Sequence, residues 1–230
     1  MKLIWDPIEA LFLQRLNRFA AMVEVEGRQV MVHVPNSGRM RELLRPRARV
    51  LLAERSGPRK TAFDLLMAYD GERLVSIDSR LPPLLLEEAL LAGKLPELGS
   101  VRGVRREVVS GESRLDLMLD GEDEPIFVEA KSITLVRGGV AMFPDAPTTR
   151  GVRHLEELRK LSERGYGAAA AFVIQRDDAD AFTPHVESDP LFAAAIAAVS
   201  PRVALLAYCC RVSPGEIVLD RRVPVVLPQV

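Results

Sequence analysis

In the first 78 residues, apolar and polar side chains alternate in short runs, and this period of two is typical of β-strands. Turn sequences separate the runs, such as Glu26-Gly27-Arg28, where glycine readily takes the positive φ that a tight hairpin needs. The spacing predicts six strands, at residues 11–17, 19–26, 29–34, 49–54, 62–69 and 73–78.

A short helix is predicted between the third and the fourth of these strands. Asn36 or Ser37 can cap it, and Met40, Leu43 and Leu44 give it an apolar side. About five strands with one inserted helix are typical of a small closed barrel of the oligonucleotide-binding (OB) type. We therefore predict an OB-like β-barrel at the start of the chain.

Helical and strand patterns are mixed in the rest of the chain, which favours an α+β or α/β domain. A helix is expected directly after the barrel because prolines open an apolar run that Gly93 ends. We therefore expect two domains, the barrel at residues 1–80 and a larger second domain at residues 81–230. Its predicted helices are 81–93, 149–164 and 190–199, and its predicted strands are 104–109, 114–119, 126–131, 168–175, 203–212, 217–219 and 223–227.

Two neighbouring strands of the second domain carry the candidate chemistry. Side chains alternate between the faces of a strand, so Asp116, Glu129 and Lys131 meet on one surface if these strands pair. Unpaired charges near a sheet centre are costly, whereas two carboxylates can hold a divalent metal through hard oxygen ligands. The lysine can then orient a water molecule or neutralise charge on a phosphoryl group. Taken alone, the spacing also fits a salt-bridged pair on a solvated sheet face.

The loop H-V-P-N-S-G-R-M before the predicted barrel helix is a candidate phosphate contact. Asn36 and Ser37 can exchange hydrogen bonds, and Arg39 offers a planar fork of donors. A helix N-terminus at this point would also attract an anion. A capped helix that follows a strand end explains the same residues without any ligand.

A second loop, F-P-D-A-P-T-T-R-G, precedes the second helix of the larger domain. Asp145 is either a further metal ligand or the cap of that helix. Arg150, Arg153 and His154 would contact phosphate, or they are solvated helix residues. Gln175, at the end of an apolar strand, is either an active-site polar group or a strand terminator.

The net charge of −1 hides an asymmetry along the chain. The first 60 residues hold 12 Lys or Arg and 6 Asp or Glu, and the others hold 19 and 26. A basic front segment suits a polyanion, although arginines on solvated strands give the same counts. The longest apolar stretches are far shorter than the ~20 residues of a membrane span, and no signal-peptide pattern opens the chain. Cys209 and Cys210 are expected as buried strand residues, and the protein as cytoplasmic with no membrane segment.

The order of elements after the barrel is helix, three strands, helix, strand, with Asp116 on the second strand and Glu129 and Lys131 on the third. This order, with these residues in these places, resembles the core of the PD-(D/E)xK nuclease superfamily. The resemblance implies a restriction-endonuclease-like αβββαβ domain in which Asp116 and Glu129 hold Mg²⁺ or Mn²⁺ and Lys131 positions the attacking water. Glu88, or less readily Glu87, would be the additional helical acid.

Six stretches extend the resemblance beyond topology. They are H-V-P-N-S-G-R-M at 33–40, L-L-R-P-R-A-R-V at 43–50, S-R-L-D-L at 113–117, F-V-E-A-K-S-I-T-L at 127–135, F-P-D-A-P-T-T-R-G-V-R-H-L at 143–155 and Q-R-D-D-A-D-A-F-T-P at 175–184. Together they are similar to the sugar fermentation stimulation protein A family, with departures at Val34, Ser37, Asp78, Ser79 and Pro83. The resemblance implies an OB-like barrel, a nuclease-like domain, DNA binding and a role in regulating sugar fermentation genes.

We therefore expect a DNA-binding protein with a Mg-dependent phosphodiesterase (nuclease) site. The alternative is a non-catalytic DNA-binding regulator that keeps a nuclease fold. The DNA would be single-stranded, duplex or branched, and an oligomer is compatible with the sequence. An enzyme of carbohydrate metabolism ranks last because the sequence has no G-x-G-x-x-G and no P-loop. The expected nucleic-acid contacts are Arg18, Asn36, Ser37, Arg39, Arg114 and Arg150.

Overall fold

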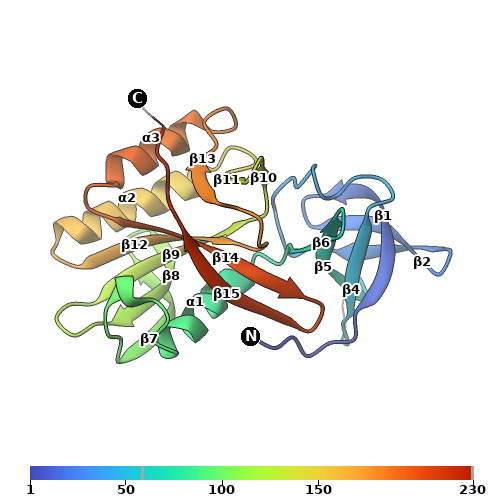
Figure 1. The fold of residues 1–230 in the computed structure, drawn as a ribbon, viewed down its shortest axis with the longest axis horizontal. Helices are drawn as coiled ribbons and strands as arrows, with labels where there is room; N and C mark the ends of the chain where they lie inside the picture. The colour runs from blue at the N-terminus through green and yellow to red at the C-terminus, as the bar shows by residue number, and fades with distance from the viewer. Residues whose placement is uncertain (58–59, 229–230) are drawn as a thin grey trace.

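The computed structural model describes residues 1–57 and 60–228 and contains a small barrel beside a larger mixed domain (Figure 1). In the N-terminal domain, six strands pair in the order β3-β2-β1-β4-β5-β6. β3 also pairs with β5 through His33 and Asp64, and this contact closes the sheet. The OB-like barrel predicted from the alternation of apolar residues is confirmed. Its strands are β1 (Ile8–Asn17), β2 (Ala20–Val25), β3 (Arg28–His33), β4 (Arg49–Glu54), β5 (Phe63–Asp70) and β6 (Arg73–Ser76).

The connection between β3 and β4 is a turn, so the helix predicted there was wrong. The N–H groups of Leu43 and Leu44 both donate to the carbonyl of Met40, at 3.1 and 2.8 Å. Met40 itself has a φ of 47°, which does not continue a right-handed helix. All three side chains are buried in the barrel core with Phe12 and Val32, so the predicted apolar side of this segment exists on a different backbone.

The C-terminal domain is built on a six-stranded sheet in the order β15-β14-β12-β9-β8-β7. β9, β12 and β14 run parallel, and antiparallel strands flank them on both sides. Helix α1 covers one face, and α2 and α3 cover the other (Figure 1). No helix in the described residues is long and apolar enough to cross a membrane. The elements are α1 (Leu81–Leu91), η1 (Pro96–Leu98), β7 (Gly103–Ser110), β8 (Ser113–Asp120), β9 (Ile126–Ile133), α2 (Thr149–Glu163), β12 (Gly167–Ile174), α3 (Pro190–Val199), β14 (Ala204–Ser213) and β15 (Glu216–Val223).

A second, three-stranded sheet was not predicted. It consists of β10 (Val136–Arg137), β11 (Val140–Phe143) and β13 (Ala181–Pro184), with β11 parallel to β13. Strands of two to four residues are too short to show a periodic pattern. This sheet fixes the start of the loop that leads from β11 into α2, and this loop lies beside the candidate site.

Gln175 joins the two domains at the end of β12. Its carbonyl accepts from the N–H of Ser76 at 3.1 Å, and its Oε1 accepts from the Ser76 hydroxyl at 2.9 Å. Its Nε2 donates to the Asp78 carbonyl at 3.0 Å and to the Ser132 hydroxyl at 2.8 Å. Gln175 is fully buried, so each of these bonds replaces water. The residue therefore holds the barrel against the carboxyl ends of β9 and β12.

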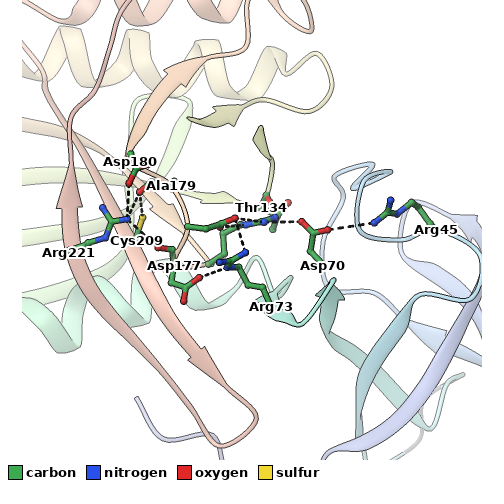
Figure 2. A network of polar contacts seen from close by, with 11 residues as sticks. Arg45, Asp70, Arg73, Thr134, Asp177, Ala179, Asp180, Cys209 and Arg221 are labelled. Atoms are coloured by element: carbon green, nitrogen blue, oxygen red, sulfur yellow. Dashed lines mark hydrogen bonds and ion pairs between the residues drawn. The ribbon is translucent and has the colours of Figure 1, made fainter. Parts of the chain in front are cut away.

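A charged network continues this contact (Figure 2). Arg176 is buried and donates to Asp70 at the tip of the β5–β6 hairpin, at 2.9 Å, and to Asp178 at 2.6 Å. Asp70 also pairs with Arg45 of the barrel at 3.6 Å, and Figure 2 shows it between Arg45 and the larger domain. On the same hairpin, Arg73 pairs with Asp177 at 2.6 Å. Arg73 also pairs with Asp178, at 3.3 Å. The segment after β12 thus binds the barrel through three charged side chains, one basic and two acidic.

Replacing Arg176 with alanine is expected to lower the free energy of unfolding by about 2–3 kcal/mol. A buried guanidinium with two carboxylate partners is lost, and hydrogen bonds to charged groups are the costly ones to break. Chemical denaturation followed by circular dichroism measures the change. Arg159→Ala is the matched control, because Arg159 makes exposed pairs within α2 and its loss should change little. Equal effects of the two substitutions would contradict a stabilising interdomain network.

Candidate functional site

The paired strands β8 and β9 place the two carboxylates side by side. Their register aligns Leu117 with Val128, so Asp116 lies next to the start of the Glu129-Ala130-Lys131 segment. Asp116 Oδ2 accepts from the N–H of Ala130 at 2.8 Å, which fixes the carboxylate against β9. The strand pairing therefore brings Asp116, Glu129 and Lys131 together, as their alternation along the two strands indicated.

Glu129 is the most enclosed member of this cluster, with 3% of its side chain exposed. Its Oε1 accepts from Lys131 Nζ and contacts His154 Nδ1 from helix α2. Its Oε2 is buried and has no hydrogen-bond partner within residues 1–57 and 60–228. A buried carboxylate oxygen without a partner is costly, so this atom is the natural position for an added ligand.

His154 connects the cluster to Arg150, one helical turn earlier. Arg150 Nε donates to His154 Nε2 at 3.3 Å. Because a guanidinium can only donate, Nε2 acts as the acceptor and the imidazole proton lies on Nδ1, facing Glu129. The order of contacts is therefore Arg150, His154, Glu129 and Lys131.

The two carboxylates differ in acidity. Burial raises the pKa of Asp116 to about 6, and the negative charge of Glu129 adds to this effect. Burial also opposes the ionisation of Glu129, but Lys131 and His154 outweigh it and lower the pKa of Glu129 below its usual value. Glu129 is thus the stronger acid of the pair, and a nearby cation would favour the ionised form of Asp116 most.

The cluster lies in a cavity of about 670 Å³ between the two domains. The β8–β9 strands supply Asp116, Glu129 and Lys131, and the β11–α2 loop and the barrel supply further parts of the lining. Of the sequence-predicted nucleic-acid contacts, four line this cavity: Arg18, Asn36, Ser37 and Arg150. The carboxylate pair and four of the six predicted contacts are therefore in one place.

The structure places the other predicted site residues elsewhere. Glu88 accepts from the N-terminal ammonium of Met1 at 2.7 Å. Glu129 contacts α2, whereas α1 covers the opposite face of the sheet, so Glu88 cannot join the cluster. Arg114 pairs with Glu107 at 3.6 Å on the exposed end of the β7–β8 hairpin. Arg39 is exposed on the barrel loop next to the cavity-lining residues.

The contacts of the β11–α2 loop exclude one of the two alternatives for Asp145, the helix cap. Asp145 Oδ2 accepts from the N–H of Met40 at 2.9 Å and so binds the barrel turn, while Thr148 caps α2 by accepting from Gly151 N at 3.0 Å. Asp145 is therefore a bridge between domains and not the helix cap. A side chain at Gly38 would lie 3.0 Å from this carboxylate, which explains why a glycine fits there.

Comparison with known proteins identifies the relatives of this chain. The model described as "SfsA N-terminal OB domain" matches residues 13–77, and the model described as "Sugar fermentation stimulation protein RE domain" matches residues 80–216. The chain belongs to the sugar fermentation stimulation protein family. A homologue in this family from Moorella thermoacetica is 46% identical over 92% of this chain and 93% of its own, and one from Caldanaerobacter subterraneus is 44% identical over 98% and 100%.

A solved structure supports the same assignment. The structure of Pyrococcus furiosus SfsA in complex with Ca²⁺ superposes with a TM-score of 0.90 at 33% identity, and the match covers 98% of this chain and 99% of that one. The family resemblance found from the sequence is therefore confirmed over both domains.

The donor set of this sugar fermentation stimulation family member fits one hard divalent cation. Within the described residues, no three His, Cys, Asp or Glu side chains form a group that could hold a metal, so the protein ligands of a cation here would be Asp116 and Glu129 alone. Mg²⁺ is commonly bound by one or two carboxylates, with waters and substrate phosphate oxygens as the other ligands. The unpartnered Oε2 of Glu129 and the raised pKa of Asp116 both agree with a cation that these two carboxylates would hold.

The sequence did not predict the contact that His154 makes. The sequence suggested a phosphate contact or a solvated helix residue, but His154 is buried and contacts Glu129. Its position directly before Leu155, on the face of α2 that also buries Leu158 and Leu161, was the available signal. Residues on the buried face of a helix point toward the sheet, and Glu129 lies on that sheet.

Proposed function

We propose that this protein is a metal-dependent nuclease that hydrolyses phosphodiester bonds in nucleic acid, with DNA as the expected substrate. The observation that carries the proposal is the buried Glu129, with an unpartnered oxygen, beside Asp116 and Lys131 in a cavity shared with an OB barrel. A salt-bridged pair on a solvated sheet face would be exposed, whereas Glu129 is not. Burial of this cluster is therefore better explained by chemistry than by surface solvation.

Each residue has a distinct role in the proposed reaction. Asp116 and Glu129 would hold Mg²⁺ or Mn²⁺, and the cation would supply charge stabilisation and a more acidic water. Lys131, beside Glu129, would orient the attacking water or neutralise charge on the phosphoryl group. The Pyrococcus furiosus relative forms a complex with Ca²⁺, which prefers the same oxygen ligands as Mg²⁺, and this complex supports a divalent cation in the family.

The cavity also offers groups that suit a phosphate backbone. Arg18 and Arg150 bring positive charge, and Asn36 and Ser37 bring neutral donors. Binding through such contacts weakens as salt rises, because phosphate neutralisation releases counterions. A protein that binds DNA in EDTA and leaves it intact with every metal would instead be the non-catalytic regulator.

The direct test is metal-dependent cleavage of labelled DNA. Products that form with Mg²⁺ or Mn²⁺, and are absent in EDTA and in the Asp116→Asn variant, would support the proposal. Intact DNA in all lanes, at protein concentrations that shift it fully, would overturn it.

Replacing His154 with alanine is expected to weaken Mn²⁺ binding by about 10- to 100-fold, because groups that orient a metal-binding carboxylate have effects of this size. His154→Asn should retain most of the affinity, since its amide nitrogen occupies the place of Nδ1 and still donates to Glu129. Isothermal titration calorimetry of the protein alone measures both. Equal losses in the two variants would contradict an orienting hydrogen bond and indicate a packing role.

A further inference from the structure

The turn between β1 and β2 presents an aromatic ring beside the cavity. Phe19 is 50% exposed, although large apolar side chains are usually buried. Phe19 and Arg18 both line the cavity that holds Asp116 and Glu129. An aromatic ring and a guanidinium are thus neighbours on the barrel wall, facing the same space as the carboxylates.

This turn is held rigidly. Arg15 donates from Nε to the Asn17 carbonyl at 3.0 Å and from its terminal nitrogen to the Asn36 carbonyl at 2.7 Å. Asn17 Oδ1 accepts from the N–H of Phe19 at 2.9 Å, and the Phe19 carbonyl accepts from Val34 N at 2.9 Å. The backbone of Phe19 is therefore fixed relative to the neighbouring barrel loop, as a preorganised binding surface requires.

The ring of Phe19 is also supported from one side. The imidazole of His33 lies 6.4 Å from it, centroid to centroid, with an interplanar angle of 27°. His33 Nδ1 lies 3.0 Å from the Phe19 carbonyl, which fixes the imidazole in turn. Phe19 nevertheless stays 50% exposed, so this packing leaves room for a further flat group.

We propose that Phe19 is a stacking platform for a base of single-stranded nucleic acid, with Arg18 on the adjacent phosphate, and that the strand continues to Asp116 and Glu129. This inference rests on the proposed function and names its substrate class. OB folds bind single strands in this manner, with aromatic rings under successive bases. Inside a duplex the base faces are covered by neighbouring bases, so an exposed ring can stack on an unpaired base or at a helix end but not within the paired helix.

The size of the cavity agrees with a single strand. About 670 Å³ is within the range of pockets that enclose small ligands, and its walls come from both domains. A flexible unpaired strand can pass between the domains, whereas a base-paired helix needs an open groove. A duplex substrate would therefore need an unpaired segment, such as a frayed end or a single-stranded flap.

The experiment is fluorescence anisotropy in EDTA with a labelled 12-nucleotide single strand and the duplex of the same sequence. Phe19→Ala is expected to weaken single-strand binding about tenfold, and Phe19→Trp to preserve it, because every aromatic ring can stack on a base. The dependence on salt should keep its slope in Phe19→Ala, since no phosphate contact is removed. Leu16→Ala is the matched control: Leu16 is 42% exposed on β1, just before the turn that holds Phe19, but it is not a cavity residue.

Two results would overturn the inference. One is Phe19→Ala binding as tightly as Leu16→Ala, and the other is wild-type protein binding the duplex as tightly as the single strand. Because no cleavage occurs in EDTA, the outcome is independent of the nuclease proposal. A protein that stacks a single strand but never cleaves would defeat only the nuclease, and one that cleaves without any effect of Phe19→Ala would defeat only the platform.

Discussion

Replacing Asp116 with asparagine is expected to lower the affinity for Mn²⁺ by at least about 100-fold and to remove metal-dependent cleavage. Asparagine keeps an oxygen that can accept from the N–H of Ala130, so the strand contact survives and only the charge is lost. Asp116 is also the carboxylate whose pKa is raised to about 6 by burial and by Glu129, so a bound cation would stabilise its ionised form. Isothermal titration calorimetry with Mn²⁺, in the absence of nucleic acid, measures the change.

The matched control for this substitution is Asp120→Asn on the same strand. Asp120 is exposed and pairs only loosely with Arg102, at 3.7 Å, so its neutralisation should leave metal binding unchanged. Identical titrations of Asp116→Asn and Asp120→Asn would show that the cation, if any, binds elsewhere. Thermal unfolding of both variants separates lost binding from lost structure.

Replacing Lys131 with methionine is expected to slow cleavage by about 100- to 1,000-fold, the usual effect of removing one group that stabilises developing charge. Methionine keeps most of the aliphatic stem, so the packing on β9 is largely preserved. Metal binding should persist, because Asp116 and Glu129 remain and Glu129 loses a competing partner. The single-turnover cleavage rate, measured with enzyme in excess over a labelled oligonucleotide, reports the chemical step.

Lys160→Met controls for the loss of a lysine as such, since Lys160 is exposed near the end of α2. Lys131→Arg provides a second comparison. It keeps the charge, but a planar guanidinium does not replace a compact ammonium in an enclosed site, so it should not restore the rate. A Lys131→Met enzyme as fast as Lys160→Met would remove Lys131 from the mechanism.

The sequence predicted the barrel and the carboxylate pair because both depend on local periodicity. The alternation of apolar and polar side chains predicted the strands. The same alternation predicted that Asp116, Glu129 and Lys131 share a surface if their strands pair, and β8 and β9 do pair. The apolar run of β12 was also predicted correctly as a buried strand, since both of its faces are covered by helices.

The remaining differences come from features that a periodic pattern does not contain. The positive φ of Met40 turned an expected helix into a turn. The side on which α1 packs decided that Glu88 meets Met1 and not Glu129. The contact between His154 and Glu129 spans 25 residues of sequence and depends on how α2 lies against the sheet. The positions of Glu88 and His154 depend on how helices pack against a distant part of the sheet. Local sequence propensity does not contain this information.

The most direct test of the nuclease assignment is a cleavage gel with labelled single-stranded, duplex and branched DNA, each with Mg²⁺, Mn²⁺ or EDTA, run with wild-type protein beside Lys131→Met. We predict metal-dependent products from substrates that contain an unpaired strand, and their loss in Lys131→Met. Full-length DNA in every lane, or equal cleavage by wild type and Lys131→Met, would contradict a nuclease site formed by Asp116, Glu129 and Lys131.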